Sequence, residues 1–375
     1  MTISLDPKVI GAIHGALKSI PERRNVIPVC GTYLLEPTET GISVTATDMD
    51  IEATISIEMA STDIVATCIQ PYLLEAAAGL RAEMIKIVID DQQATFSAGR
   101  ARFKAPVLPG GDFPRAAHQF DHRFTLAGEA LATLIASTVD AVSTEETRYY
   151  LQGVFVDCHD GRLHAVATDG HRLHTTSVAM TDAATLDYGI IIPTKAAKEI
   201  ERLARKAGGN AVIIETSRSG IAVKSGDERI VSKLVDGNYP DWRRVVPKES
   251  DNALTIDLGE MLAALDRVLK IQTVNEADMK LKTAAVRLSV DGDALTIQNG
   301  GRNTIAGAVD GVACEVMGDW AEHGVNGRYL RITLAALKDR GVETITINSA
   351  DSGSPMRLES PTDEDFLAIV MPMRV

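Results

Sequence analysis

The feature that most constrains this chain is a segment that recurs three times along its 375 residues. The copies begin at Ser4 (SLDPKVIGAIHGALKSI), Thr125 (TLAGEALATLIASTVDA) and Thr255 (TIDLGEMLAALDRVLKI). Each opens with two residues that we expect to be in a β-strand and continues with apolar residues at helical spacing. That spacing predicts a helix with one buried face. Such a repeat constrains the architecture before any motif does. The apolar positions are Val9, Ile10, Ile13 and Leu17, then Leu131, Leu134, Ile135 and Val139, then Met261, Leu262, Leu265 and Leu269.

A second landmark recurs at the same offsets. The copies above are separated by 121 and 130 residues. The same steps carry Thr47-Asp48 in VTATDMDI to Thr168-Asp169 in AVATDGHRL, and then to Gln298-Asn299 in LTIQNGG. Each pair follows a strand-like stretch, and the match of Asp48 to Asp169 favours a turn-capping role over a pair of catalytic carboxylates. Two independent landmarks on one offset make a chance similarity a poor explanation.

A second helix is predicted in each unit. PYLLEAAAGL begins at Pro71, PTKAAKEIERLARKAG at Pro193 and NGRYLRITLAALKDRG at Asn326. Proline in a first helical turn is a start signal, and glycine after a basic residue is a stop signal. Stretches such as MIKIVID, AVIIETS and TITINS alternate apolar and polar residues, as strands do. We therefore expect three α+β units of two helices over an antiparallel sheet, spanning 1–122, 123–250 and 251–375.

The open edges of such sheets suggest how the units assemble. Exposed sheet edges are normally paired or covered, so three tandem units could join their sheets edge to edge. Two such chains arranged head to tail would close a ring of six units. The repeat by itself does not require that closure.

Composition bears on the cellular compartment and on possible metal sites. The start, MTISLDPKVI, has no basic segment followed by an apolar stretch, and no apolar run is long enough to span a bilayer. The four cysteines are far apart and include no C-x-x-C pair, which argues against a zinc site or a disulfide framework. A reducing cytoplasm is the simplest compartment. The cysteines are Cys30, Cys68, Cys158 and Cys314.

Three stretches resemble the bacterial sliding clamp family, the beta subunit of DNA polymerase III. They are RYYL-x-G at 148–153 followed by AVATDGHRL at 165–173, then SKLVDGNYPDWRRVVPK at 232–248, and the terminal VMPMRV at 370–375. They occur in the family's order, in a chain of the family's length. The resemblance implies a head-to-tail homodimer that encircles double-stranded DNA without reading its sequence. It also implies a non-catalytic processivity factor that tethers the replicative polymerase, the clamp loader and other proteins, with no cofactor and no membrane.

The resemblance further implies a peptide-binding pocket between the second and third units. Short apolar segments of the partners, often starting with Gln, would dock there. Apolar residues and adaptable methionines suit that task, and arginines can meet the polar parts of a ligand. The residues carried over are Leu151, Thr168, Gly170, His171, Arg172, Leu173, Pro240, Arg244, Val245, Tyr329, Val370, Met371, Pro372, Met373 and Arg374.

For the other surfaces the resemblance implies DNA contacts and a subunit interface. The expected DNA-contacting residues are Arg24, Tyr150, Lys195, Lys198 and Arg202, and the expected interface residues are Phe103 and Ile271. This sequence departs from the family at Tyr72, where a basic residue is common, at Val375, where Leu is usual, and in extra residues at 275–285. Those departures leave open a divergent clamp paralogue with restricted partners.

The net charge of −13 argues at first against a nucleic-acid partner. The three windows 8–24, 195–206 and 328–340, however, hold 13 basic and 4 acidic residues, against 38 basic and 51 acidic in the whole chain. A basic lining would hold the phosphate backbone, and an acidic exterior would repel DNA. The competing interpretation is that these charges are only solvated helix faces.

A histidine cluster supplies an alternative of another class. His164, His171 and His174 lie near Asp169, which would suit a metal-dependent hydrolase. Neighbouring side chains of a strand point to opposite faces, so His171 and His174 are not expected to share a side. Asp169-Gly170 is more typical of a turn. We expect no metal site and no catalytic residues here, and no nucleotide-binding or hydrolase motif is present.

Overall fold

A computed structural model of the chain describes residues 2–22, 27–59, 64–180, 186–279, 284–299 and 307–374. These residues form an α+β fold with antiparallel strand pairing, which confirms the predicted class. They divide into two compact units, residues 1–128 with 202–234 and residues 129–201 with 235–375. No helix in the described ranges is both long and apolar enough to cross a membrane.

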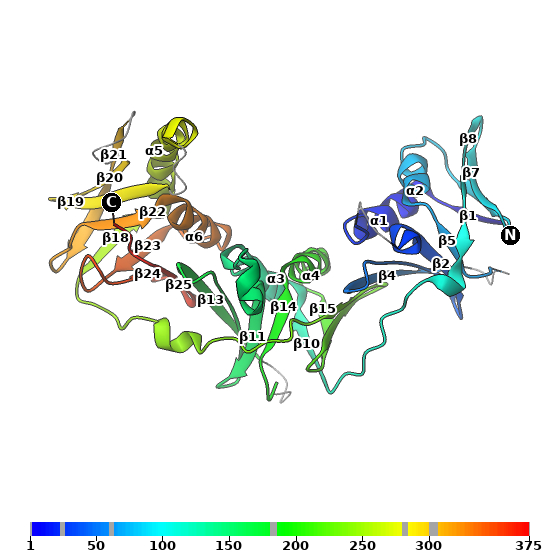
Figure 1. Cartoon of the computed structure of the whole chain (residues 1–375), viewed down its shortest axis with the longest axis horizontal. Helices are drawn as coiled ribbons and strands as arrows, with labels where there is room; N and C mark the ends of the chain where they lie inside the picture. The colour runs from blue at the N-terminus through cyan, green and yellow to red at the C-terminus, as the bar shows by residue number, and fades with distance from the viewer. Residues whose placement is uncertain are drawn as a thin grey trace. The chain divides into compact units, whose positions relative to one another are not determined.

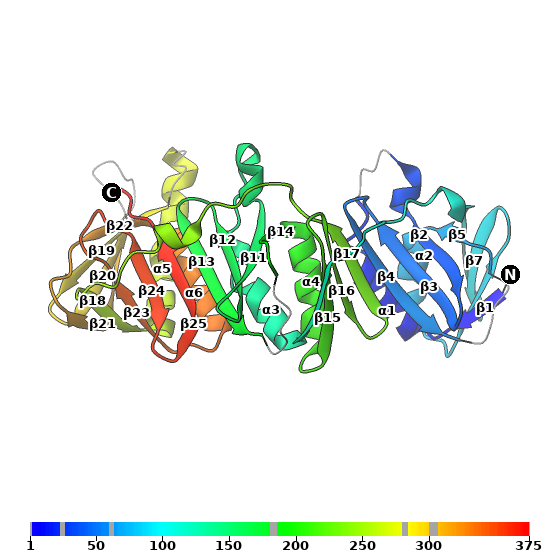
Figure 2. The same ribbon diagram turned by 90° about the horizontal axis from the view of Figure 1, so that it is seen from below.

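The first unit contains helices α1 (Pro7–Leu17) and α2 (Pro71–Ala78), which pack side by side behind strands β2, β3 and β4 (Figures 1 and 2). One sheet has the strand order β1-β6-β7-β8, and a second has the order β10-β15-β16-β17-β4-β3-β2-β5-β9. The strands are β1 (Thr2–Leu5), β2 (Tyr33–Thr38), β3 (Gly41–Thr47), β4 (Ile51–Glu58), β5 (Thr67–Ile69), β6 (Ile85–Ile89), β7 (Gln93–Ala98), β8 (Ala101–Pro106), β9 (Leu108–Pro109), β10 (His122–Ala127), β15 (Ala211–Thr216), β16 (Gly220–Ser225) and β17 (Glu228–Lys233).

The second unit contains a twelve-stranded sheet with α3 (Gly128–Ala136), α5 (Leu258–Met279) and α6 (Gly327–Asp339). Helix α4 (Thr194–Ala207) begins in this unit and ends in the first. The strand order is β14-β11-β12-β13-β25-β24-β23-β18-β21-β20-β19-β22. The strands are β11 (Gly153–His159), β12 (Arg162–Thr168), β13 (Arg172–Ala179), β14 (Ile190–Pro193), β18 (Ala253–Asp257), β19 (Ala285–Asp291), β20 (Ala294–Asn299), β21 (Ala308–Met317), β22 (His323–Asn326), β23 (Thr344–Asn348), β24 (Met356–Ser360) and β25 (Asp363–Val370).

The repeats join their sheets edge to edge, as expected from their open edges. Strand β17 of the second repeat pairs with β4 of the first, placing Ile230 opposite Ala53. Strand β13 of the second repeat pairs with β25 of the third, placing Leu173 opposite Ile369. The strands of the second repeat are therefore shared between two continuous sheets.

The second helix of each repeat begins at, or one residue after, the position where the local sequence signal places it. Asp6 caps α1 by accepting a hydrogen bond from the Lys8 amide (2.7 Å), and Asn326 caps α6 through the Arg328 amide (3.0 Å). These side chains satisfy backbone donors that a helix N-terminus leaves unpaired. Pro193 was predicted to open a helix, but it is the last residue of β14 and α4 begins at Thr194.

The predicted apolar faces are mostly buried. Ile10, Ile13 and Leu17 of α1 are buried, as are the first three apolar positions of each later copy. Val9 has 37% of its surface exposed, and Leu269 is half-buried. Val139 is buried, but it lies in a short 3-10 turn beyond the end of α3.

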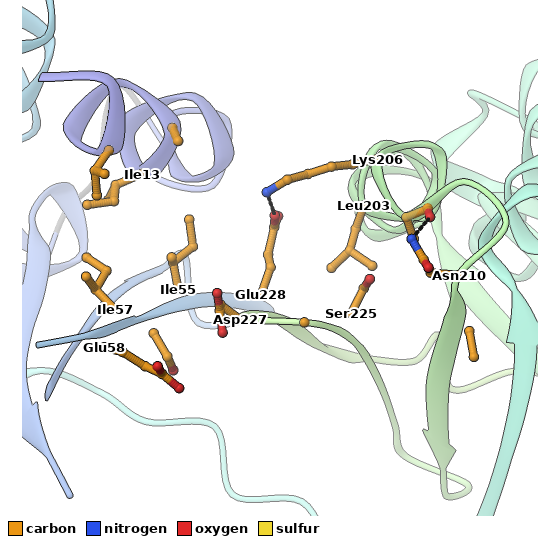
Figure 3. A pocket seen from close by; sticks show the side chains of 16 residues that line it. Ile13, Ile55, Ile57, Glu58, Leu203, Lys206, Asn210, Ser225, Asp227 and Glu228 are labelled. Carbon is orange, nitrogen blue, oxygen red and sulfur yellow. Dashed lines mark hydrogen bonds and ion pairs between the residues drawn. The ribbon is translucent and has the colours of Figure 1, made fainter. Parts of the chain in front are cut away.

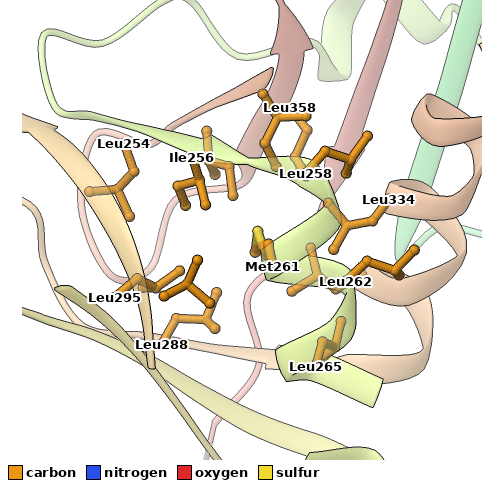
Figure 4. Packing of buried hydrophobic residues seen from close by; sticks show 14 of the residues in the cluster. Leu254, Ile256, Leu258, Met261, Leu262, Leu265, Leu288, Leu295, Leu334 and Leu358 are labelled. Atoms are coloured by element: carbon orange, nitrogen blue, oxygen red, sulfur yellow. The ribbon is translucent and has the colours of Figure 1, made fainter. Parts of the chain in front are cut away.

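The third repeat contains an extensive cluster of buried residues, built from α5, α6 and the surrounding strands (Figure 4). Met261, Leu262 and Leu265 of α5 point toward Leu334 of α6 and toward the strands. Helix α5 continues to Met279, so part of the extra segment predicted at 275–285 is helical. Residues 280–283 lie outside the described ranges, and β19 begins at Ala285.

The two Thr-Asp landmarks adopt the same turn. Asp48 Oδ1 accepts hydrogen bonds from the amides of Asp50 (2.9 Å) and Ile51 (2.8 Å). Asp169 Oδ1 does the same for His171 (2.9 Å) and Arg172 (3.0 Å). The preceding threonines also match, because each hydroxyl donates to the carbonyl four residues later. The turn-capping interpretation of both aspartates is thus confirmed.

Candidate functional site

A cavity of about 380 Å³ lies in the second unit at the end of the β13–β25 pair. One wall comes from the turn before β13 and another from the segment 239–245. The third wall is formed by Pro355, which directly precedes β24, by Ile369 of β25, and by Met371, which directly follows β25. Apolar side chains predominate, as in most ligand pockets. The lining residues are Leu151, Thr168, Gly170, Arg172, Leu173, Tyr239, Pro240, Asp241, Trp242, Val245, Pro355, Ile369 and Met371.

The floor of this pocket is a small buried apolar cluster. Leu173 and Ile369 lie opposite each other across the antiparallel pair, and they pack with Val166 and Trp242. Side chains opposite each other on one face of a sheet lie close enough to pack directly. Tyr239 is held beside the cluster by stacking on Phe155, with ring centroids 4.6 Å apart and planes within 7°.

The turn that precedes β13 shapes one wall. Gly170 has φ +87°, a left-handed conformation that residues with a Cβ rarely adopt. A Cβ there would also lie 2.8 Å from Nη1 of Arg148, which donates to the Asp169 carbonyl (3.2 Å). Met49 occupies the equivalent place in the first repeat with φ +81°, so this turn can accommodate a residue with a side chain. At position 170 the nearby Arg148 also leaves no room for a Cβ, which is a second reason for glycine there.

Arg172 is the buried cation of the pocket, with only 7% of its surface exposed. Its Nε lies 3.2 Å from Asp169 Oδ2, its Nη2 donates to the Asp140 carbonyl, and its guanidinium carbon lies 4.7 Å from the centre of the Tyr329 ring. Its Nη1 is buried and has no hydrogen-bond partner among the described residues. The charge is therefore largely compensated from within the protein.

Burial raises the pKa of the Tyr329 phenol, with a smaller contribution from Asp169.

The C-terminal segment is bound on both sides. The Met371 amide donates to the His171 carbonyl (2.8 Å), and the Met373 amide donates to the Gly324 carbonyl (2.8 Å). Pro372 forms an isolated bridge with Val325. These contacts hold residues 371–373 against the neighbouring turn and strand.

Eight of the fifteen residues expected in the pocket line this cavity, and seven do not. His171 stacks on Tyr329 with ring centroids 6.1 Å apart, and Val370 is fully buried. Arg244 is highly exposed and pairs with Asp241. The expected residues outside the cavity wall are His171, Arg244, Tyr329, Val370, Pro372, Met373 and Arg374.

Five lining residues were not expected. Tyr239, Asp241 and Trp242 lie in the same YPDW stretch as Pro240, so aromatic residues beside a loop proline were the available signal. Ile369 precedes the terminal motif by one residue and faces the pocket through its pairing with Leu173. Pro355 carries no local signal, because only the pairing of β24 with β25 brings it near.

A polar network holds the opposite face of the β13–β25 pair. His174 is fully buried, with Nδ1 3.0 Å from the Ser137 carbonyl and Nε2 2.8 Å from Thr333 Oγ1. Burial, assisted by Arg172, lowers the pKa of His174 to about 3, so the ring is neutral. Arg340 binds both oxygens of Asp363 (2.5 and 2.8 Å) and keeps the pKa of that carboxyl below its usual range.

The histidines considered for a metal site have separate settings. His174 bonds within the core, His171 stacks on Tyr329, and the ring of His164 lies 6.1 Å from that of Trp242. Burial lowers the pKa of His164. Within the described ranges, no group of three or more His, Cys, Asp or Glu residues could hold a metal ion.

The residues expected to contact DNA have different surroundings. Arg24 lies outside the described ranges. The ring of Tyr150 packs edge-on against that of Tyr149, with ring centroids 5.7 Å apart. On α4, Lys198 is exposed and Lys195 is half-buried. Arg202 instead donates to the buried carboxylate of Glu228, which argues against its expected role on the phosphate backbone.

The two expected interface residues lie on different elements. Phe103 is half-buried on β8, opposite Phe96 of β7. Ile271 is half-buried on α5. Strand β8 ends its sheet, so its outer edge is unpaired within the described part of the chain.

Comparison with known proteins gives matches along the whole chain. Three family models match in succession: the N-terminal domain of the DNA polymerase III beta subunit at 3–117, its central domain at 125–241 and its C-terminal domain at 243–374. The chain is 32% identical to the beta sliding clamp of Caulobacter vibrioides over 392 residues, covering 100% of both proteins. It is 30% identical to that of Pseudomonas aeruginosa, covering 95% of both.

Solved structures are similar over the same length. A C. crescentus beta sliding clamp with bound polyethylene glycol superposes with a TM-score of 0.90 at 31% identity, covering 100% of this chain and 99% of that one. A Bartonella birtlesii DNA polymerase III subunit beta bound to griselimycin gives a TM-score of 0.90 at 30% identity, with 100% of both chains covered.

Proposed function

The chain belongs to the DNA polymerase III beta subunit family, the beta sliding clamps, and we propose that it encircles duplex DNA as a homodimeric ring. In that role it tethers the replicative polymerase, the clamp loader and other partners, and it catalyses no reaction itself. The observation that carries the proposal is the succession of three family domains along 3–374. We take the domains as 1–122, 123–250 and 251–375, and we place the protein in the cytoplasm, where its free cysteines stay reduced.

Ring closure is supported by two open strand edges. Strand β8 has an unpaired edge and carries the exposed Arg102 and Lys104. The first half of β21 pairs only with β20 among the described residues, and it carries Asp310, which is bound by Arg267. Pairing β8 of one subunit with β21 of the next would satisfy both edges. Phe103 and Ile271 are the apolar residues proposed for that interface.

The pocket is proposed as the docking site for partner peptides. An apolar cavity of this size suits a few apolar side chains, and the flexible Met371 in its wall can adapt to several of them. The remaining expected residues would contact the parts of a peptide that lie beyond the cavity. His171 and Tyr329 form a stacked platform, and Arg244 and Arg374 are exposed cations suited to carboxylates.

DNA contact is proposed through Arg24, Tyr150, Lys195 and Lys198. Such contacts go to the phosphate backbone and carry no sequence information. Because ring topology retains the protein, each contact can be weak. The experiment that tests the proposal loads the protein onto nicked circular DNA and measures retention. We expect a dimer that stays on the circle and leaves after linearisation. A monomer at micromolar concentration that is not retained on the circle would overturn the proposal.

A divergent clamp with restricted partners is the second candidate. It is favoured by the departures from the family pattern at Tyr72 and at 275–285, where residues 275–279 extend α5. Peptides from the host polymerase separate the two cases. Binding at the pocket supports the main clamp, whereas retention on circular DNA without such binding supports the restricted one.

A further inference from the structure

Glu228 is a buried carboxylate that binds two cations of α4. It is the first residue of β17 and only 3% of its surface is exposed. Oε1 accepts a hydrogen bond from Arg202 Nη2, and Oε2 accepts one from Lys206 Nζ (3.1 Å). Figure 3 shows Lys206 reaching from α4 toward Glu228. One buried anion thus holds two of the five basic residues of this helix.

The direction of Arg202 strengthens the point. A second contact of its Nη2 goes to the Ala16 carbonyl of α1 (3.5 Å). The guanidinium is therefore directed toward the boundary between α1 and α4. Because Arg202 and Lys206 share the negative charge of one carboxylate, the pair has less capacity to exchange counterions with a phosphate than two free cations would have.

A cavity lies beside the carboxylate and the Lys206 side chain. It has a volume of about 760 Å³ and lies between α1 and α4, over Ile55 and Ile57 of β4 (Figure 3). Lys206 and Glu228 both line it, and the Lys206 side chain is 64% exposed. Among the contacts that the structure describes for Lys206, only the bond to Glu228 directs its ammonium group toward the sheet.

We propose that Glu228 is an internal counter-charge that limits how strongly α4 holds the DNA backbone. The inference rests on the proposed clamp function and concerns the tuning of its DNA contact. Each phosphate neutralised by a lysine or arginine adds to the affinity and to its salt dependence. Withholding Arg202 and Lys206 keeps that affinity low, which favours movement along DNA. The two cations still pair Glu228, so the fold does not carry an uncompensated buried charge.

The test is a binding titration with the full-length protein and a short fluorescent linear duplex, onto whose ends a ring can thread. Glu228→Gln keeps the side-chain volume and removes the charge. We expect the variant to bind about three- to tenfold more tightly at about 50 mM salt, and the log–log salt slope to steepen by about 1 to 2. Adding Arg202→Gln and Lys206→Gln to this variant should remove the gain.

Two single variants on the exposed surface make the test independent of the buried substitution. Lys206→Gln should leave the salt slope unchanged and lower the affinity less than about twofold, whereas Lys198→Gln should reduce the slope by about 1. Equal losses for the two lysines, or an unchanged slope in a folded Glu228→Gln variant, would overturn the proposal and leave the clamp function standing. Absence of any salt-dependent binding by the unmodified protein would instead remove both.

Discussion

Leu173 of β13 lies directly opposite Ile369 of β25, and both side chains form the floor of the candidate pocket. The two residues are far apart in the chain and belong to different repeats. Their pairing makes the pocket a product of the junction between the repeats. Any change that weakens the junction should therefore affect peptide binding as well as stability.

The first prediction concerns the two methionines of the terminal motif. Met371 lines the cavity, whereas Met373 does not. We expect Met371→Ala to weaken binding of a clamp-binding peptide by about 1–3 kcal/mol, because it removes apolar contacts in a desolvated pocket. Isothermal titration calorimetry measures the difference. Met373→Ala is the matched control and should cost clearly less; a larger loss at Met373 would show that the peptide contacts lie mainly outside the cavity.

The second prediction uses the duplicated turn. Asp169→Ala removes the acceptor for two backbone amides and the partner of Arg172 Nε. We expect a loss of about 1–3 kcal/mol in the free energy of unfolding, together with weaker peptide binding. Chemical denaturation and peptide titration measure the two effects.

Asp48→Ala is the control for this turn, since Asp48 caps the equivalent turn with the same two bonds. It should destabilise the protein by a similar amount and leave peptide binding unchanged. Loss of peptide binding in both variants would mean that the effect comes from general destabilisation.

The third prediction concerns pH and His174. The pKa of His174 is about 3 in the folded chain against 6.5 for an ordinary histidine. The unfolded state therefore binds one more proton than the folded state between these two pH values. The contribution of His174 to the free energy of unfolding is fully present above about pH 6.5 and is lost progressively as the pH decreases toward 3. The slope from this one group approaches about 1.4 kcal/mol per pH unit. Denaturation curves between pH 7.5 and about pH 5 measure it.

His174→Gln should be less stable than the unmodified protein at pH 7.5, since it disturbs the bonds to Ser137 and Thr333, but its stability should depend less on pH. The Asp363 carboxyl, whose pKa is lowered, acts only in a more acidic window. Parallel curves for His174→Gln and the unmodified protein would contradict the assignment.

The fourth prediction concerns the proposed subunit interface. Phe103→Asp places a carboxylate on the edge strand β8 at a half-buried position opposite Phe96. We expect the dimer dissociation constant to rise by at least about tenfold, equivalent to about 1.4 kcal/mol, because the charge must be desolvated in the interface. Sedimentation velocity measures it. Arg100→Asp, in the neighbouring hairpin turn, is the comparison for the effect of charge alone; equal effects would point away from a packed Phe103.

The sequence by itself determined the threefold repeat, the positions of the six helices and the duplicated Thr-Asp turn. These features depend on interactions within a few residues: the spacing of Ile10, Ile13 and Leu17, the cap at Asp6, and the two amides bound by Asp169. Local geometry makes such patterns visible in one dimension. Even here the helix boundary at Pro193 was one residue off, because that proline ends a strand.

Only the tertiary structure decided which side chains meet. Ile369, Pro355 and Trp242 face the pocket because strand pairing and a loop from other parts of the chain bring them to Leu173. Arg202, which was expected to contact DNA, donates to Glu228, which lies on a strand 26 residues further along. A count of basic residues on a helix cannot reveal this, because the compensating carboxylate comes from another element and its effect depends on burial.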